Sequence, residues 1–153
     1  MQIVKLIFWI IFCQLPAWAG AAAVSRGLDW YHGLVQPSFT PPDWAFSAAW
    51  GVLYILMGVA GFFLTRQGLR REIRPALLLF IFQLALNALW TPVFFGKQAP
   101  GWALCILTGL IVANAFLLKQ LWGVCRRAFW LLVPYMIWLA FAWCLNGAII
   151  LLN

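Results

Sequence analysis

Charged residues are scarce in this sequence, and acidic ones most of all. Asp, Glu, Lys and Arg make up 8% of the 153 residues, with 3 acidic side chains, whereas 66% of the residues are apolar. Soluble proteins carry about 25% charged residues, so this composition excludes a domain whose whole surface faces water. The three acids, Asp29, Asp43 and Glu72, lie between or at the ends of the apolar runs. No carboxylate is therefore expected inside a membrane, where it could couple protons to transport.

Metal-ligand clusters and familiar catalytic motifs are also missing. The 4 cysteines form no CxxC pair, and we interpret them as small buried apolar residues. The single histidine, His32, has only Asp29 and Asp43 near it in sequence, too few and too loosely spaced for a zinc site. There is no phosphate-binding loop, serine elbow or acid and base pair. We expect no metal and no required cofactor.

Long apolar runs fill the sequence instead. Each approaches the roughly 20 residues that a helix needs to cross the hydrocarbon core of a bilayer. We predict an all-α membrane protein, a five-transmembrane-helix bundle in which residues 1–153 form a single domain, with helices at about 3–24, 42–65, 75–95, 101–121 and 129–152. Proline marks three of the starts, at Pro41–Pro42, Pro75 and Pro100. The remaining long connection, residues 25–41, is predicted to be a loop that acts as an outer lid.

The positive residues are distributed unevenly between the two predicted faces of the membrane. The amino end and the second and fourth connections hold Lys5, Arg66, Arg70, Arg71, Arg74, Lys119, Arg126 and Arg127, and the opposite side holds Arg26 and Lys97. The positive-inside rule then predicts a cytoplasmic amino terminus, with the carboxyl terminus and loop 25–41 outside. This distribution explains the net charge of +7 without a nucleic-acid partner. A basic patch that binds anionic lipid headgroups remains an open alternative.

The amino-terminal segment imitates a secretory signal peptide. Lys5, an apolar stretch and the small residues around Trp18 have the expected order. The apolar run continues as far as Val24, beyond the apparent cleavage site. We therefore expect the segment to be retained as the first helix.

Tryptophan is abundant, with 11 residues. Many lie near predicted helix ends, as in the aromatic belt at a membrane interface. Two lie deeper: Trp50 is roughly 12 Å along its helix from the outer end, and Trp138 is roughly 14 Å along its helix from the inner end. Both are predicted to lie near the middle of the bilayer.

Two predicted helices combine aromatic and amide residues on one face. Their helical spacing groups Gln83, Asn87 and Trp90 on residues 75–95, and Trp138, Ala142 and Asn146 on residues 129–152. Amides in hydrocarbon need hydrogen-bond partners, so both faces should point into the bundle. They could hold the helices together, at about 0.6 kcal/mol per hydrogen bond. Alternatively, they could line a pocket for a flat apolar ligand.

Three blocks of sequence carry a family resemblance: residues 36–44 (QPSFTPPDW), 87–96 (NALWTPVFFG) and 134–142 (PYMIWLAFA). In order and spacing they closely resemble the TspO/MBR family, which includes the tryptophan-rich sensory protein and the translocator protein, or peripheral-type benzodiazepine receptor. The resemblance extends from about Trp30 to Asn146.

The resemblance implies a five-helix bundle with a pocket near the outer helix ends, covered by the first loop. It also implies ligands: tetrapyrroles such as protoporphyrin IX and haem, sterols in several members, and synthetic isoquinolines and benzodiazepines. The residues at matching positions are Trp30, Tyr31, Trp50, Asn87, Trp90, Cys105, Trp138, Ala142 and Asn146.

Two departures from the family pattern qualify these expectations. The sterol-recognition pattern of animal members is absent, because Leu145 to Asn153 contains no tyrosine, lysine or arginine. Cholesterol transport is therefore not expected, and the short termini resemble those of bacterial members, which suggests a bacterial cell membrane. Family dimers form through small residues on the third helix, whereas residues 77–82 here are bulky. Whether this protein forms a homodimer is therefore left open.

Three functions remain compatible with the sequence. The first is a tetrapyrrole-binding sensor, regulator or transporter-like protein, in which Trp50, Trp90 and Trp138 sandwich the macrocycle and Asn87 and Asn146 orient its polar edges. The second is a porphyrin-degrading enzyme that depends on light and oxygen, with Trp50 and Trp138 as electron donors. The third is a membrane assembly partner with a vestigial pocket.

Overall fold

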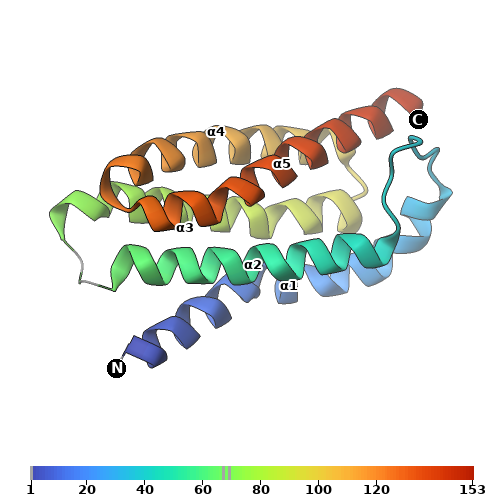
Figure 1. The fold of residues 1–153 in the computed structure, drawn as a ribbon. Helices are drawn as coiled ribbons and strands as arrows, with labels where there is room; N and C mark the ends of the chain where they lie inside the picture. Colours follow the sequence, from blue (N-terminus) through green and yellow to red (C-terminus); the bar gives the residue numbers. More distant parts are fainter. Residues whose placement is uncertain (1, 67, 69) are drawn as a thin grey trace.

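A computed structural model of the chain describes residues 2–66, 68 and 70–153, and five long helices account for most of them (Figure 1). They are α1 (Gln2–Gly33), α2 (Asp43–Thr65), α3 (Arg74–Thr91), α4 (Pro100–Val124) and α5 (Arg126–Leu152). A short 3₁₀ turn, η1 (Arg71–Ile73), precedes α3, and a π-helical turn, η2 (Pro92–Gly96), extends it. The described residues contain no strand, so the predicted all-α class is confirmed.

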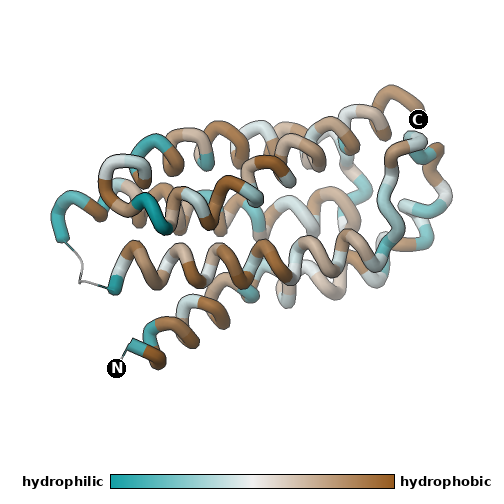
Figure 2. Tube along the Cα trace, viewed as in Figure 1, coloured by the Kyte–Doolittle hydropathy of each residue, from teal (hydrophilic) through white to brown (hydrophobic). Residues whose placement is uncertain are grey.

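All five helices are long and apolar enough to cross a membrane, with the third span running from Arg71 to Gly96. Hydrophobic residues follow the helices through the middle of the bundle, and hydrophilic ones gather toward its two ends (Figure 2). Helices that satisfy their own backbone hydrogen bonds are one of the two structures that can span hydrocarbon. The protein is therefore an integral, multi-pass membrane protein.

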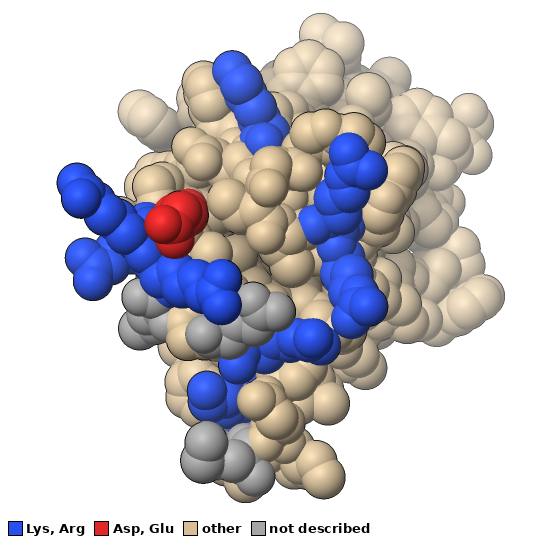
Figure 3. Space-filling model, turned by 60° about the vertical axis from the view of Figure 1, so that its left-hand side comes forward, with Lys and Arg blue, Asp and Glu red and all other residues tan. Residues whose placement is uncertain are grey.

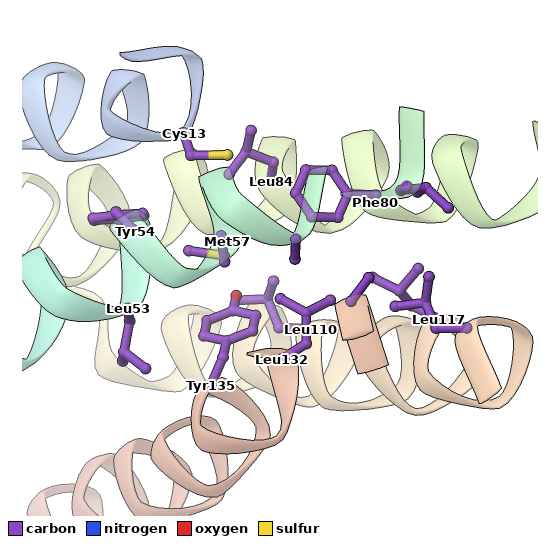
Figure 4. Close-up of a cluster of buried hydrophobic side chains, with 14 of the residues drawn as sticks. Cys13, Leu53, Tyr54, Met57, Phe80, Leu84, Leu110, Leu117, Leu132 and Tyr135 are labelled. Atoms are coloured by element: carbon purple, nitrogen blue, oxygen red, sulfur yellow. The ribbon is translucent and has the colours of Figure 1, made fainter. Parts of the chain in front are cut away.

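The helices form a closed ring around a common core. α1 packs on α2 and α3, α2 packs on α5, and α4 lies between α5 and α3. Side chains from all five helices meet inside, including Cys13, Met57, Phe80, Leu110 and Tyr135 (Figure 4). Each of these five side chains is at most 1% exposed. Packing of this kind supplies much of the attraction between helices in a membrane, where no hydrophobic effect drives them together.

The first helix is longer than predicted, and this difference changes the lid. Helices α2, α4 and α5 begin and end within three residues of the predicted positions, and α3 together with η2 does so within one residue, which is the usual uncertainty of such boundaries. By contrast, α1 continues to Gly33, so the prediction that residues 25–33 belong to a loop was wrong. Only residues 34–42 form the connection between α1 and α2.

The polar residues that suggested a loop form one face of a helical extension. Arg26, Asp29 and His32 are exposed, whereas Gly27 and Tyr31, one turn apart, are buried. This is the pattern of an amphipathic helix. A Cβ atom on Gly27 would overlap the backbone carbonyl of Phe95, so the absence of a side chain lets α1 pass directly against η2.

The ends of the bundle differ in charge. In Figure 1 the left-hand end holds the start of α1, the end of α2 and the turn between α4 and α5, and the right-hand end holds residues 34–42 and the carboxyl terminus. Lys and Arg side chains spread over the left-hand end (Figure 3). The predicted grouping of basic residues at one end is therefore present in the fold.

Candidate ligand cavity

A cavity of about 380 Å³ lies between α1, α2, α5 and the junction of α3 with η2. It occupies the half of the bundle nearest residues 34–42, and its wall is mostly apolar. Its lining comprises Gln14, Ala17, Gly20, Val24, Leu28, Tyr31, Asp43, Phe46, Ser47, Trp50, Gly51, Tyr54, Trp90, Thr91, Phe94, Phe95, Ala142, Leu145, Asn146 and Ile149. Small-molecule sites typically measure about 300–1,000 Å³.

One side of the cavity is a continuous aromatic wall. Trp50 stacks on Tyr54 with ring centroids 5.4 Å apart and planes 27° apart. Trp90 stacks in the same way on Phe94, at 5.2 Å and 20°. The two stacks meet where Trp50 and Trp90 lie 6.5 Å apart with planes 31° apart. All four rings line the cavity, so a flat ring bound there could contact them in an offset stack or edge to face.

The third tryptophan of the predicted sandwich lies behind this wall. The Trp138 ring meets Trp50 edge to face, at 6.3 Å and 85°, and it also contacts Phe46 and Phe141. It is not among the residues that line the cavity. A ring held between Trp50 and Trp90 would need them roughly 7 Å apart or more, since carbon atoms in contact are 3.5–4.0 Å apart. The geometry therefore forms a wall and does not form the predicted sandwich.

Gln83, Asn87 and Trp90, the polar and aromatic stripe on one face of α3, have two different roles. Asn87 is 3% exposed, and both of its amide atoms are used: Oδ1 accepts a 2.7 Å hydrogen bond from the Tyr54 hydroxyl, and Nδ2 donates a 2.8 Å bond to the Tyr135 hydroxyl. Gln83 is fully buried and lies 3.8 Å from the Met57 sulfur atom through Nε2. These two amides join helices in the core. Of the three residues on this stripe, only Trp90 lines the cavity.

On α5, Ala142 and Asn146 both line the cavity. In the orientation that satisfies both amide atoms, Asn146 donates to the Pro100 carbonyl (3.1 Å) and accepts from the Leu104 amide (3.2 Å). Its amide thus attaches α5 to the first turns of α4 and closes one corner of the cavity. The small side chain of Ala142 leaves space beside it.

The remaining predicted site residues divide between the cavity and its surroundings. Tyr31 lines the cavity, and Trp30 packs behind it against Phe94, with ring centroids 5.7 Å apart. Cys105 is exposed and lines a separate depression on the outer side of α3 and α4. The structure therefore does not bring Cys105 to the cavity.

Helix α1 forms a wall of the cavity that the sequence patterns did not predict. Gln14, Ala17, Val24, Leu28 and Tyr31 line the cavity at helical spacing, so they follow one face of α1 through four turns. Gln14 was the available signal, because it is the polar member of an otherwise apolar run.

Two residues that line the cavity carry a buried hydrogen-bond donor without a partner among the described residues. The Tyr31 hydroxyl and the Trp90 indole nitrogen are buried, and neither has a hydrogen-bond partner in the part of the chain that the structure describes. Both residues line the cavity. Buried donors without partners are costly, so an acceptor group on a bound molecule would relieve that cost.

Polar contacts join the chain segments at the end of the bundle nearest the cavity. His32 Nε2, in the last turn of α1, lies 2.8 Å from Asp43 Oδ2, at the start of α2. The loop itself is attached to the end of α5, since the Val35 amide donates to Asn153 Oδ1 (2.9 Å) and Asn153 Nδ2 donates to the Val35 carbonyl (3.2 Å). None of residues 34–42 lines the cavity, so the covering role of the loop remains a prediction.

No group of three or more His, Cys, Asp or Glu residues that could hold a metal ion occurs among the described residues. The side chains that line the cavity offer stacking, apolar packing and a few hydrogen bonds. The class of protein that the fold defines is a five-helix membrane bundle with an aromatic cavity toward one end.

Comparison with known proteins identifies the family. Residues 9–152 match the sequence model of the TspO/MBR family. The chain is 36% identical to the tryptophan-rich protein TspO of Chlorobaculum tepidum, across 99% of this chain and 98% of the relative. It is 36% identical to the tryptophan-rich sensory protein of Cereibacter sphaeroides (95% and 92%) and 41% identical to the translocator protein of Sus scrofa (80% and 74%). The chain belongs to the TspO/MBR family, as the resemblance predicted.

Proposed function

We propose that this protein binds tetrapyrroles such as protoporphyrin IX or haem in the cavity between α1, α2, α3 and α5. The observation that carries the proposal is the aromatic wall formed by Trp50, Tyr54, Trp90 and Phe94 beside an apolar space of about 380 Å³. A flat, extended π system suits such a wall better than a branched aliphatic molecule does, because offset stacking needs a planar face.

The polar groups of the cavity fit the edge of such a ligand. A protoporphyrin carries two carboxylates on one edge of its ring, and the Tyr31 hydroxyl and Trp90 indole nitrogen are unpaired donors in the described chain. Hydrogen bonds to charged acceptors are stronger than neutral ones. The macrocycle would lie against the wall with its acidic edge toward these donors. Flat synthetic isoquinolines and benzodiazepines, which carry fewer acceptors, would use the same wall.

A sensory or regulatory role suits the chain better than active pumping. Asp29, Asp43 and Glu72 are exposed and lie near helix ends or in a connection, so no acid in the described residues is placed to couple protons across the bundle. One relative is named a tryptophan-rich sensory protein. We infer that ligand binding changes the packing around the cavity and that this change is the signal.

The charge distribution supports one orientation. The end that carries most of the arginines and lysines is the cytoplasmic end under the positive-inside rule. Residues 34–42, the carboxyl terminus and the cavity then lie toward the outer face. We propose that the membrane is a bacterial cell membrane.

A titration of the purified protein in detergent with protoporphyrin IX tests the function. Trp50 and Trp90 line the cavity, so binding should quench tryptophan fluorescence saturably in the dark. Absence of saturable quenching would contradict the proposal. Illuminating the same sample separates a binder from a degrader: retained porphyrin absorbance indicates binding alone, and its light-dependent loss only with protein present would support the enzymatic alternative.

A further inference from the structure

A second depression, of about 550 Å³, lies at the basic end of the bundle, far along α2 from the ligand cavity. Its described lining comes from the last turn of α2, from Arg66, Gly68 and Arg70 before η1, and from the turn between α4 and α5. Arg66, Arg70 and Arg127 line it together with one acid, Glu72. The depression therefore carries a positive charge at a place where three chain segments meet.

Two of these arginines are held on one aromatic ring. The guanidinium carbon of Arg66 lies 5.5 Å from the centroid of Phe63, and that of Arg127 lies 5.4 Å from the same centroid. Cation–π contacts attract each guanidinium to the ring. Phe63 thus brings together cationic groups from the end of α2 and the start of α5.

These cations have no acidic partner in the described chain. The single ion pair among the described residues joins His32 to Asp43 at the other end of the molecule, so Glu72 neutralises none of the three arginines directly. Like charges held close together repel one another, and the repulsion is stronger near a low-dielectric surface. An anion between the guanidinium groups would turn this repulsion into attraction.

The depression also has apolar walls. Leu64 and Ile73 are buried beneath it, and Val124 lies at its side. α2 ends at Thr65, α4 ends at Val124 and α5 begins at Arg126, so the arginines stand at the level where membrane-spanning segments meet water. Arg126 stands over the Trp122 ring at 4.3 Å nearby, as expected for an interfacial aromatic residue. A site that is cationic at its rim and apolar beneath fits a headgroup joined to acyl chains.

We propose that this depression binds the phosphate group of an anionic phospholipid at the basic face of the membrane. Arg66 and Arg127 contact the phosphate oxygens through their planar guanidinium groups, and Arg70 completes the positive rim. A guanidinium group is planar and can donate two parallel hydrogen bonds to a phosphate. Attraction by a diffuse surface charge does not depend on this geometry. A topology signal alone would need the charges but not their convergence on one ring. A free phosphate ion would not use the apolar walls.

The test compares lipids and variants by native mass spectrometry of the full chain released from detergent. The amount of bound lipid is measured over a range of concentrations, once with anionic phosphatidylglycerol and once with zwitterionic phosphatidylcholine. The site variant is Arg66→Gln with Arg127→Gln. Its matched control is Arg74→Gln with Lys119→Gln, which removes the same charge at the same end but outside the depression. Phe63→Leu keeps every charge and removes only the ring between the two guanidinium groups.

Phosphatidylglycerol should bind more tightly than phosphatidylcholine. The site variant should bind it about tenfold more weakly or worse, and the control less than about threefold more weakly. Phe63→Leu should also weaken binding, which keeps the test valid if the double variant folds poorly. Equal losses in the site variant and the control would show diffuse attraction and overturn the proposal. Competition by inorganic phosphate at the same concentration as the lipid would also overturn it, in favour of a free-ion site.

Discussion

The Tyr54 hydroxyl donates a 2.7 Å hydrogen bond to the side-chain carbonyl of Asn87, and this contact separates the core of the bundle from its cavity. Tyr54 lines the cavity, whereas Asn87 does not, and the Asn87 amide also donates to Tyr135. One amide therefore joins α2, α3 and α5 directly beneath the aromatic wall. We therefore expect any effect of Asn87 on the proposed ligand to pass through Tyr54, which stacks on Trp50.

Replacing Asn87 by Leu should reduce stability more than the loss of an ordinary interhelical hydrogen bond. Interhelical bonds in membranes average about 0.6 kcal/mol. Here two buried tyrosine hydroxyls would lose their amide partner, at about 1–3 kcal/mol for each group left unpaired. Thermal unfolding in detergent measures the loss, and Tyr135→Phe, which removes one of the two bonds, should cost less. Unchanged stability with abolished ligand binding would instead place Asn87 in direct contact with the ligand.

Gly58→Ala should destabilise the protein, because α1 and α2 cross at this glycine. A Cβ atom there would lie 2.6 Å from the Cα atom of Ile10, so the backbones would have to separate. Overpacking of this kind typically costs about 1–3 kcal/mol. The control is Gly147→Ala on α5, where an added Cβ meets nothing within 4 Å and should be neutral or slightly stabilising. Equal unfolding temperatures for the two variants would contradict the close crossing.

The loop formed by residues 34–42 should open more readily when its attachment to α5 is removed. Asn153→Ala deletes both hydrogen bonds to the Val35 backbone, so hydrogen exchange across residues 34–42 should speed up, with Ser38→Ala, an exposed change in the same loop, as the control. Saturating protoporphyrin IX should slow exchange there in the parental protein. Identical exchange with and without ligand would argue against a lid.

Trp138→Phe should change dark binding of protoporphyrin IX by less than about tenfold. The indole of Trp138 supports Trp50 from behind and does not line the cavity, and phenylalanine retains an aromatic face. Trp90→Ala, which removes part of the wall itself, should weaken binding more. If the parental protein consumes porphyrin in light, a specific loss of that activity in Trp138→Phe would support electron donation by its indole. A larger loss of dark affinity in Trp138→Phe than in Trp90→Ala would contradict the placement of these rings.

Periodicity and hydropathy were sufficient to predict five spanning helices, and the spacing of Asn87 with Trp90 correctly placed them on neighbouring positions of an inward face. They could not show that Tyr54 and Tyr135, from two other helices, use both atoms of the Asn87 amide, because hydrogen-bond partners of this kind depend on tertiary packing. The same limit applies to Trp138, whose depth was predicted but whose place behind Trp50 was not.

Two other differences have local causes. The polar residues between Ser25 and His32 resemble a loop in hydropathy alone, but Gly27 and Tyr31 make that segment a helix with one buried face. Cys105 was assigned to the site by family position. It lies on the outer side of α4 because Leu107 and Asn114, which share the opposite face of that helix, point into the core.

Replacing either of two alanines on α5 by phenylalanine tests the central claim most directly. Ala142 lines the cavity and is 5% exposed, whereas Ala140, two residues away, is exposed on the outer surface of the helix. Ala142→Phe should fill space that the ligand needs, and Ala140→Phe adds the same ring on the outside. Fluorescence titration with protoporphyrin IX should show affinity weakened by about tenfold or more in Ala142→Phe and unchanged in Ala140→Phe, with both variants eluting as the parental protein does in detergent. Parental affinity in a folded Ala142→Phe variant would contradict binding in this cavity.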